Sequence, residues 1–191
     1  MNDPDDLLLA LKSVAEAFAH LGTRYYVGGS IASSFHGAMR STMDVDLLCE
    51  LDESDVEELL RLIGSDYYAS KPAIYDAIRR HSCFNLIHLP TSFKVDVFVS
   101  QRRPFDLQVV RRAEFHSLVS SGELVVPIAT VEDVILLKLE WYRIGGEVSE
   151  RQWDDIDRLI QLTRTNLDQA YLKETAELVG VSDLLDHWMK V

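Results

Sequence analysis

The sequence is short of cysteine, of basic residues and of long apolar runs, and each shortage narrows the class of protein. Its two cysteines, Cys49 and Cys83, lie in unrelated contexts and do not form the disulfide framework of a small secreted domain. No apolar stretch approaches the roughly 20 residues that span a bilayer. The first residues are acidic, where a secretory signal would be basic. We therefore expect a protein of the reducing cytoplasm with no membrane partner.

Acidic residues outnumber basic ones, with 31 Asp and Glu against 19 Lys and Arg and a formal net charge of −12. This balance argues against a broad, non-specific binder of nucleic acid, because neutralising phosphates requires clustered Lys and Arg. The basic clusters at residues 79–81, 102–103 and 111–112 indicate solvated surface, with the lining of an acceptor groove as the alternative. The hydrophobic share of 47% over 191 residues suffices for a core without disulfides or structural metal.

Hydrophobic periodicity and turn residues divide the chain into a mixed α/β part and a helical tail. Strands are expected at residues 25–27, 45–49, 84–89, 93–99 and 123–128, and helices at 4–21, 31–36, 55–63 and 72–80. The tail has helices at 131–144, 150–163, 168–179 and 182–189, with Ser54, Thr130 and Ser149 as expected N-caps. The fold class predicted is α/β (α+β), with a mixed-sheet core in residues 1–128 and a C-terminal helical segment in residues 129–191.

Three aspartates lie in two of the expected strands. Asp44 and Asp46 are two residues apart, so their carboxylates point to the same face and repel each other. Asp96 is flanked by apolar residues, where a lone carboxylate needs a partner. A divalent cation is the usual compensation, and hard oxygen ligands favour Mg²⁺ or Mn²⁺. If the two strands are neighbours, the three carboxylates can hold two metals about 3.5–4 Å apart.

A glycine-rich turn precedes these aspartates, between the first expected strand and a helix. Gly28 and Gly29 allow a close approach of the backbone, and the turn presents N–H groups that favour phosphate. The Ser30 hydroxyl can donate to the same phosphate. Each of these features alone also has a simpler interpretation. The glycines can form an ordinary turn, the Asp-x-Asp pair can lie on a solvated strand edge, and Asp96 can be a core acid with a basic partner. Their order along the chain favours the joint interpretation as a metal and phosphate site.

This order of residues resembles the nucleotidyltransferase superfamily of the DNA polymerase β type. The matching residues are Tyr26-Val27-Gly28-Gly29-Ser30-Ile31-Ala32, His36-Gly37, Arg40, Thr42 and Asp44-Val45-Asp46-Leu47. Thirteen residues separate Ser30 from Asp44, a gap more similar to that of the AbiEii-type toxins and related bacterial proteins than to that of the minimal antibiotic-modifying members. The tail of that branch carries a Lys, an Arg and an acid, similar to Lys138, Arg143 and one of Asp154, Asp155 and Asp157.

The resemblance implies a metal-dependent enzyme that transfers a nucleoside monophosphate from an NTP, ATP among them, to a hydroxyl acceptor and releases pyrophosphate. The implied catalytic residues are Asp44, Asp46, Asp96 and Lys138, the three aspartates also binding Mg²⁺ or Mn²⁺, and the implied nucleotide contacts are Gly28, Gly29, Ser30 and Arg40. The same branch implies a toxin role, with an antitoxin protein as partner.

Alternatives remain at three points. The acceptor is a tRNA end, a protein side chain or a small molecule, and the preferred base is equally open. A non-catalytic nucleotide- or partner-binding module on the same fold is a second hypothesis, and an antibiotic adenylyltransferase is a third. Lys138 follows an apolar run on its helix, so its ammonium group either reaches water or faces the cleft and binds phosphate.

Overall fold

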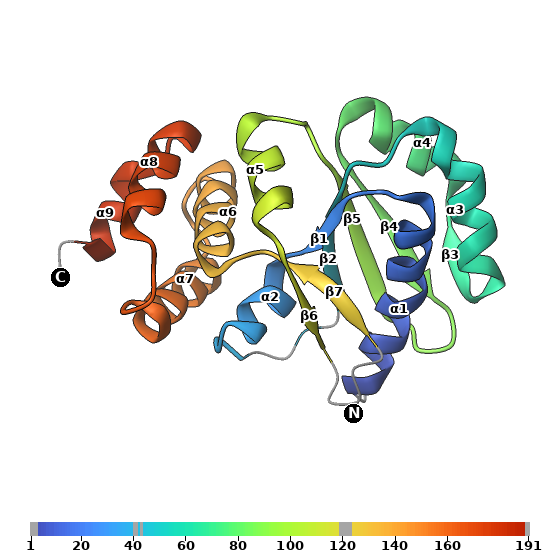
Figure 1. The fold of residues 1–191 in the computed structure, drawn as a ribbon, viewed down its shortest axis with the longest axis horizontal. Coiled ribbons are helices and arrows are strands. Elements are labelled where there is room, and N and C mark those ends of the chain that lie inside the picture. Colours follow the sequence, from blue (N-terminus) through green and yellow to red (C-terminus); the bar gives the residue numbers. More distant parts are fainter. Residues whose placement is uncertain (1–3, 40–41, 43, 119–123, 190–191) are drawn as a thin grey trace.

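The centre of the molecule is a seven-stranded mixed sheet (Figure 1). The computed structural model describes residues 4–39, 42, 44–118 and 124–189, and within them the strand order is β3-β4-β5-β2-β1-β7-β6. The strands are β1 (Tyr25–Val27), β2 (Asp44–Cys49), β3 (Tyr67–Ala69), β4 (Cys83–His88), β5 (Lys94–Val99), β6 (Glu114–Ser117) and β7 (Val125–Ile128). β2 is parallel to β5 and β1 to β7, while the other neighbours are antiparallel, so the predicted mixed α/β fold is confirmed.

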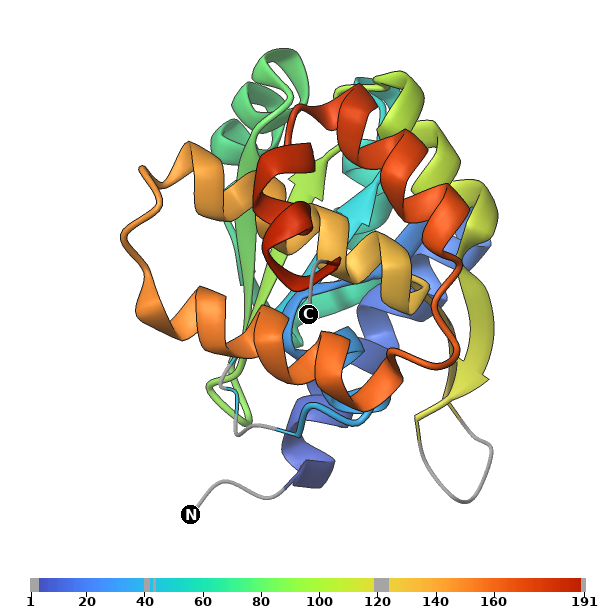
Figure 2. The same ribbon diagram turned by 90° about the vertical axis from the view of Figure 1, so that its left-hand side faces the viewer.

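Helices lie on both faces of this sheet. One face is covered by α1 (Pro4–Leu21), α3 (Val56–Ile63) and α4 (Lys71–Arg80), as Figure 1 shows. On the other face α2 (Gly29–Phe35) packs against β2, and α6 (Val131–Ile144) packs against α2. The remaining helices are α5 (Pro104–Arg112), α7 (Glu150–Thr163), α8 (Gln169–Val179) and α9 (Ser182–Met189). Figure 2 shows α6 to α9 gathered at one end of the molecule, as expected for the helical tail.

One face of β2 and β5 is wholly apolar, whereas the other carries the charged residues together with Leu48 and Phe98. The residues toward α1 are buried: Val45, Leu47, Cys49, Val95, Val97 and Val99. The stripe on α1 that covers them is fully excluded from solvent and consists of Ala10, Leu11, Val14 and Phe18. Burying one large apolar side chain stabilises a fold by about 1.5–3 kcal/mol, so this face fixes the register of both strands. The alternate residues, which include Asp44, Asp46 and Asp96, therefore point to the opposite face.

Among the α-helices and strands of the described residues, the sequence patterns did not predict β3, α5 and β6. β3 has three residues, and most of β6 is exposed, so neither carries a clear alternation of apolar and polar residues. α2 begins at Gly29 rather than at Ile31. The expected N-cap at Ser54 is wrong, because Asp52 caps the short 3₁₀ turn Glu53–Asp55 that leads into α3. The expected caps at Thr130 and Ser149 are confirmed, since each side chain accepts a backbone N–H at the start of its helix.

A buried charged cluster joins the helical tail to α5. Arg112 on α5 donates from Nε to Asp133 on α6 over 3.1 Å, and its guanidinium lies 3.7 Å from the ring centroid of Tyr171 on α8. Asp133 is fully buried and also accepts the Thr130 hydroxyl. Buried charges persist when they are paired in this way, so the cluster fixes α6 and α8 against the core. No described helix combines the length and apolar character needed to cross a membrane.

Candidate functional site

The pairing of β2 with β5 gathers the three aspartates on one face of the sheet. In the parallel register Asp46 lies opposite Asp96, and Asp44 lies opposite Lys94. Neighbouring strands are about 4.8 Å apart, so side chains at paired positions are within reach of one another. Asp44 and Asp46 are partly exposed, whereas Asp96 is 8% exposed. The structure thus brings together the three carboxylates that the sequence singled out.

The glycine turn contacts this group directly. The Gly28 N–H donates to the Asp46 carbonyl over 2.9 Å, and the Ser30 N–H donates to the Asp46 carboxylate. Gly29 has a φ of +53°, and a Cβ added to it would collide with the Asp46 carboxylate. Glycine is therefore required here both by the positive φ and by the close approach. The Ser33 hydroxyl donates to the Gly29 carbonyl over 2.8 Å, which helps to fix the turn.

Asp46 is the electrostatic centre of the site. Burial first, and then the charges of Asp44 and Asp96, raise the pKa of its carboxyl from 3.8 to about 6. The Ser30 N–H and the charge of Lys138 lower the pKa of Asp46, but by less than the other groups raise it. Desolvation and like charges both disfavour an ionised carboxylate. The ionised form of Asp46 is thus under-compensated, and a cation placed beside it would be stabilising.

Asp96 and Asp44 each have partners within the chain. The Lys94 ammonium lies 2.6 Å from Oδ2 of Asp96, and the Asn85 amide donates to Oδ1. The Thr42 hydroxyl donates to Oδ1 of Asp44 over 2.6 Å. As they lie here, no three His, Cys, Asp or Glu side chains among the described residues are arranged to hold a metal ion. A metal bound to Oδ2 of Asp96 would meet the Lys94 ammonium at the same oxygen.

Lys138 lies inside the molecule rather than reaching for water. Its ammonium group is 3.1 Å from Oδ2 of Asp155 on α7, and the two side chains are only 12% and 18% exposed. Its charge also lowers the pKa of Asp46, the smallest of the effects on that carboxyl. Of the three tail acids considered in the sequence, Asp155 is therefore the one paired with Lys138. Asp157 instead accepts the Trp188 indole N–H over 3.0 Å.

The other predicted positions divide between structural contacts and undescribed residues. Arg143 pairs with Glu147 at 3.0 Å, just after α6, and with Asp183 of α9 at 2.7 Å, so its contacts lie within the helical tail. Arg40 lies outside the described residues. Ser30 is buried at the start of α2 and has contacts within the chain.

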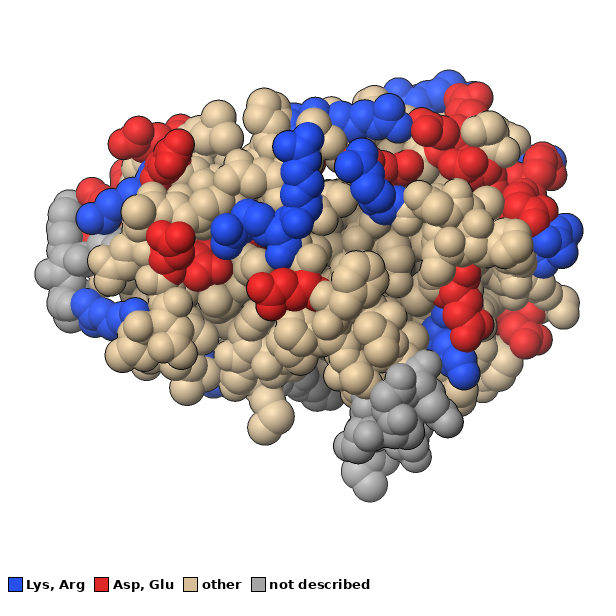
Figure 3. Space-filling model, viewed as in Figure 1, with Lys and Arg blue, Asp and Glu red and all other residues tan. Residues whose placement is uncertain are grey.

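The arginine clusters are largely paired with acids. Arg102 lies 2.7 Å from Asp52, and Arg103 lies 2.7 Å from the buried Asp106. Figure 3 shows Lys and Arg interspersed with Asp and Glu on the face in view, without a continuous basic surface. The exposed Arg79 and Arg80 thus fit the interpretation as solvated surface, whereas Arg112 belongs to the buried cluster around Asp133.

Sequence reasoning missed the immediate partners of the aspartates, Lys94 and Asn85. Lys94 was predictable in principle, because it lies two residues before Asp96 on the same strand and so shares its face. Asn85 was not, because its position opposite Asp96 depends on the register of the β4–β5 hairpin. That register is a tertiary property set by the turn and by the buried face.

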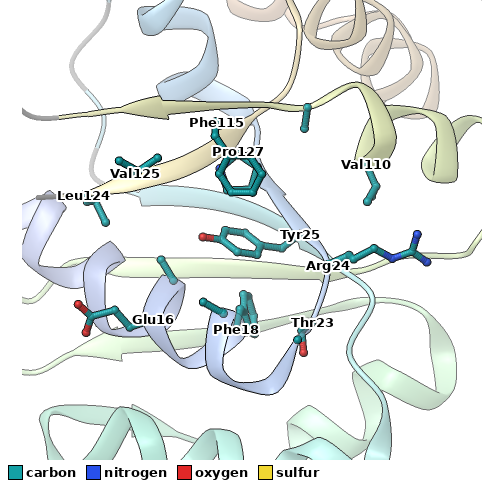
Figure 4. Close-up of a pocket in the computed structure, with 14 residues that line it drawn as sticks. Glu16, Phe18, Thr23, Arg24, Tyr25, Val110, Phe115, Leu124, Val125 and Pro127 are labelled. Atoms are coloured by element: carbon teal, nitrogen blue, oxygen red, sulfur yellow. The ribbon is translucent and has the colours of Figure 1, made fainter. Parts of the chain in front are cut away.

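A separate groove lies on the opposite face of the sheet. Figure 4 shows it between α1 and β7, with Phe18, Tyr25 and Pro127 among its lining side chains, and its volume is about 440 Å³. Tyr25 is paired with Cys49, whose side chain faces α1 rather than the carboxylates. The groove is therefore divided from the aspartates by the sheet and contributes nothing to their chemistry.

Comparison with known proteins identifies the fold. No family model and no curated protein matches the sequence. Among solved structures, an antigenic nucleotidyltransferase-like protein from Paracoccidioides brasiliensis is 20% identical, with a TM-score of 0.56 over 99% of this chain and 94% of that one. The antibiotic-resistance factor ANT(2'')-Ia is 13% identical, with a TM-score of 0.54 over the whole of both chains. The chain therefore has a nucleotidyltransferase fold, while its likeness to the AbiEii-type toxins stays a prediction.

Proposed function

We propose that the protein is a metal-dependent nucleotidyltransferase, which transfers a nucleoside monophosphate from an NTP to a hydroxyl acceptor and releases pyrophosphate. The observation that carries this proposal is the juxtaposition of Asp44, Asp46 and Asp96 on adjacent parallel strands, on a nucleotidyltransferase fold. The glycine turn at Gly28 and Gly29 contacts Asp46, and such a turn at the start of a helix favours phosphate, which supports a nucleotide site beside the carboxylates. A fold alone does not define an activity, so the proposal rests on this site.

The donor set fits Mg²⁺ or Mn²⁺. All three groups supply hard carboxylate oxygens. The charges of Asp44 and Asp96 disfavour the ionised form of Asp46, and a divalent cation would offset this repulsion. When bound, a divalent cation would supply charge neutralisation and lower the pKa of an attached oxygen. Asp44 and Asp46 would hold it from one strand and Asp96 from the next.

The residues of the chain would orient the reactants and receive the proton. The acceptor oxygen forms a bond to the α-phosphorus as the bond to pyrophosphate breaks, and the hydroxyl proton leaves toward Asp96. The backbone of Gly28 and Gly29 and the Ser30 residue would contact the triphosphate. The Lys138 ammonium, whose charge acts on Asp46, would balance phosphate charge. Positioning and charge neutralisation account for most of the catalysis in such reactions.

One experiment tests the function and sorts the acceptor classes. The purified protein is incubated with Mg²⁺ and each of four α-labelled NTPs, in separate reactions with total tRNA, cell protein or aminoglycosides. Aminoglycosides serve as the antibiotic acceptors, and antibiotics are included because ANT(2'')-Ia, which shares the fold over its full length, is an antibiotic-resistance factor. Transfer of label to one class, absent with Asp46→Asn, supports the proposal. Nucleotide binding without transfer to any acceptor supports the non-catalytic module, and a toxin role would be favoured by labelling of tRNA or protein.

A further inference from the structure

Lys94 occupies an unusual place for a cation, at the first position of β5 among the three carboxylates. Its ammonium group lies 2.6 Å from Oδ2 of Asp96, and its backbone is paired with that of Asp44 on β2. The Lys94 side chain is 43% exposed, whereas that of Asp96 is 12% exposed. Lys94 is therefore a cation that reaches from the edge of the site onto a largely buried carboxylate.

The second oxygen of Asp96 is held independently. Asn85 lies opposite Asp96 in the antiparallel register of β4 and β5, and its side-chain amide donates to Oδ1. A carboxylate oxygen has two acceptor sites, so Asn85 can keep this bond while another group binds Asp96. Asn85 fixes the orientation of the carboxylate, and Lys94 takes the position from which a cation would be bound.

A metal and the Lys94 ammonium cannot share Oδ2 of Asp96 without a large penalty. Mg²⁺ binds carboxylate oxygen at about 2.0–2.1 Å, and an ammonium group on the same oxygen would be within a few ångströms of it. Two cations so close repel each other strongly, even in the polar surroundings of a protein surface. The half-exposed Lys94 can swing out toward water, whereas the buried Asp96 is held by Asn85.

We propose that in the metal-free protein the Lys94 ammonium pairs with Asp96 at the position where a metal would bind. Binding of a divalent metal then displaces the Lys94 side chain. The chain then needs no ion to hold Asp96 in place while the site is empty. Binding of a metal breaks the ion pair between Lys94 and Asp96, so Lys94 lowers the affinity of the site for metal. This inference rests on the proposed metal dependence, but its test uses metal binding alone and requires neither nucleotide nor acceptor.

The test is a titration with Mn²⁺, followed by electron paramagnetic resonance of the free ion, on the full chain without nucleotide. Lys94→Met keeps the length of the side chain and removes its charge, and we expect it to bind Mn²⁺ about tenfold or more tightly than the wild type, because it removes the competing cation. Lys94→Arg keeps the charge and should stay near the wild type. The matched control is Lys71→Met, since Lys71 pairs with Glu57 on an exposed surface of the opposite face.

The outcomes separate this inference from the proposed function. Wild-type binding of Mn²⁺ with unchanged or weaker binding by Lys94→Met would overturn the role of Lys94 and leave the metal site standing. An equal gain in Lys71→Met would also overturn it, since the effect would then be one of net charge alone. Binding of Mn²⁺ by neither the wild type nor Lys94→Met would overturn both the role of Lys94 and the proposed metal dependence. If Lys94→Met does not fold by circular dichroism, Lys94→Gln takes its place under the same criteria.

Discussion

Gly29 lies against the carboxylate of Asp46 so closely that no other residue type fits at its position. This contact joins the glycine turn to the acidic group, and it requires both a φ of +53° and the absence of a Cβ. The turn and the Asp-x-Asp strand, which are separate motifs in the sequence, are thus one structural unit.

We therefore expect Gly29→Ala to destabilise the protein by more than the strain of a positive φ, which alone costs about 1–2 kcal/mol. The added Cβ forces Asp46 to move, and transfer activity should fall with it. Gly22→Ala is the matched control, because Gly22 has a φ of +69° with no atom within 4 Å of an added Cβ. Urea denaturation gives the free energy of unfolding of both variants. Equal losses would show that the contact with Asp46 has no energetic consequence.

A second prediction concerns the charge of Asp46 and its dependence on pH. The pKa of Asp46 is about 6 in the folded protein against an ordinary value of 3.8, so the folded state binds the proton more tightly. Between these two values the folded state carries more protons than the unfolded state, and stability falls as the pH rises through this window. The ionised form at pH 8 is thus disfavoured by an amount on the order of 1–3 kcal/mol.

Asp46→Asn should therefore be more stable than the metal-free wild type at pH 8, and this advantage should vanish near pH 4. Its nucleotidyl transfer should be lost, because a carboxylate at the centre of the site is gone. Urea denaturation at the two pH values measures the stability, with the exposed Asp66→Asn as a control. A variant that is less stable than the wild type at pH 8 would contradict the repulsion inferred here.

The binding of metal and nucleotide should be mutually dependent. A ligand that binds only the folded state, present at 100 times its dissociation constant, stabilises by about 2.7 kcal/mol. If Mg²⁺ and NTP share one site, their joint effect on the melting temperature should exceed the sum of the separate effects. A thermal scan with each ligand and with both measures this difference. Simple additivity, or the same excess in Asp46→Asn, would count against a shared site.

The sequence predicts the parts of this site better than their contacts. The side-chain period of a strand is local, so the sequence suffices to place Asp44 and Asp46 on one face of β2 and to set Asp96 apart from the apolar face of β5. The partners of these residues depend on which strands are neighbours and on helix packing. Asn85 and Asp155 therefore carry no local signal, since each is brought to its partner by tertiary structure.

The same distinction applies to the fold. The long amphipathic helix α1 and the capped helices α6 and α7 follow from hydrophobic spacing and from Thr130 and Ser149. The short strands β3 and β6 form because they extend a sheet that already exists. Strand propensity depends on neighbouring strands, so such short edge strands cannot be predicted from their own residues alone.

The last prediction concerns Lys138 and its partner. Lys138→Met keeps the apolar stem and removes a charge that acts on Asp46, so at saturating NTP we expect the rate of transfer to fall by about 10²–10³. Asp155 loses its ammonium partner at a position where its side chain is 18% exposed, and the variant should also lose about 1–3 kcal/mol of stability. Asp155→Asn keeps the charge of Lys138, so its effect on the rate should be tenfold or less. The exposed Lys173→Met serves as the control. Wild-type turnover in Lys138→Met would show that Lys138 is not part of the active site. Equal losses of rate in Lys138→Met and Asp155→Asn would show that the reaction needs the ion pair rather than the cation alone.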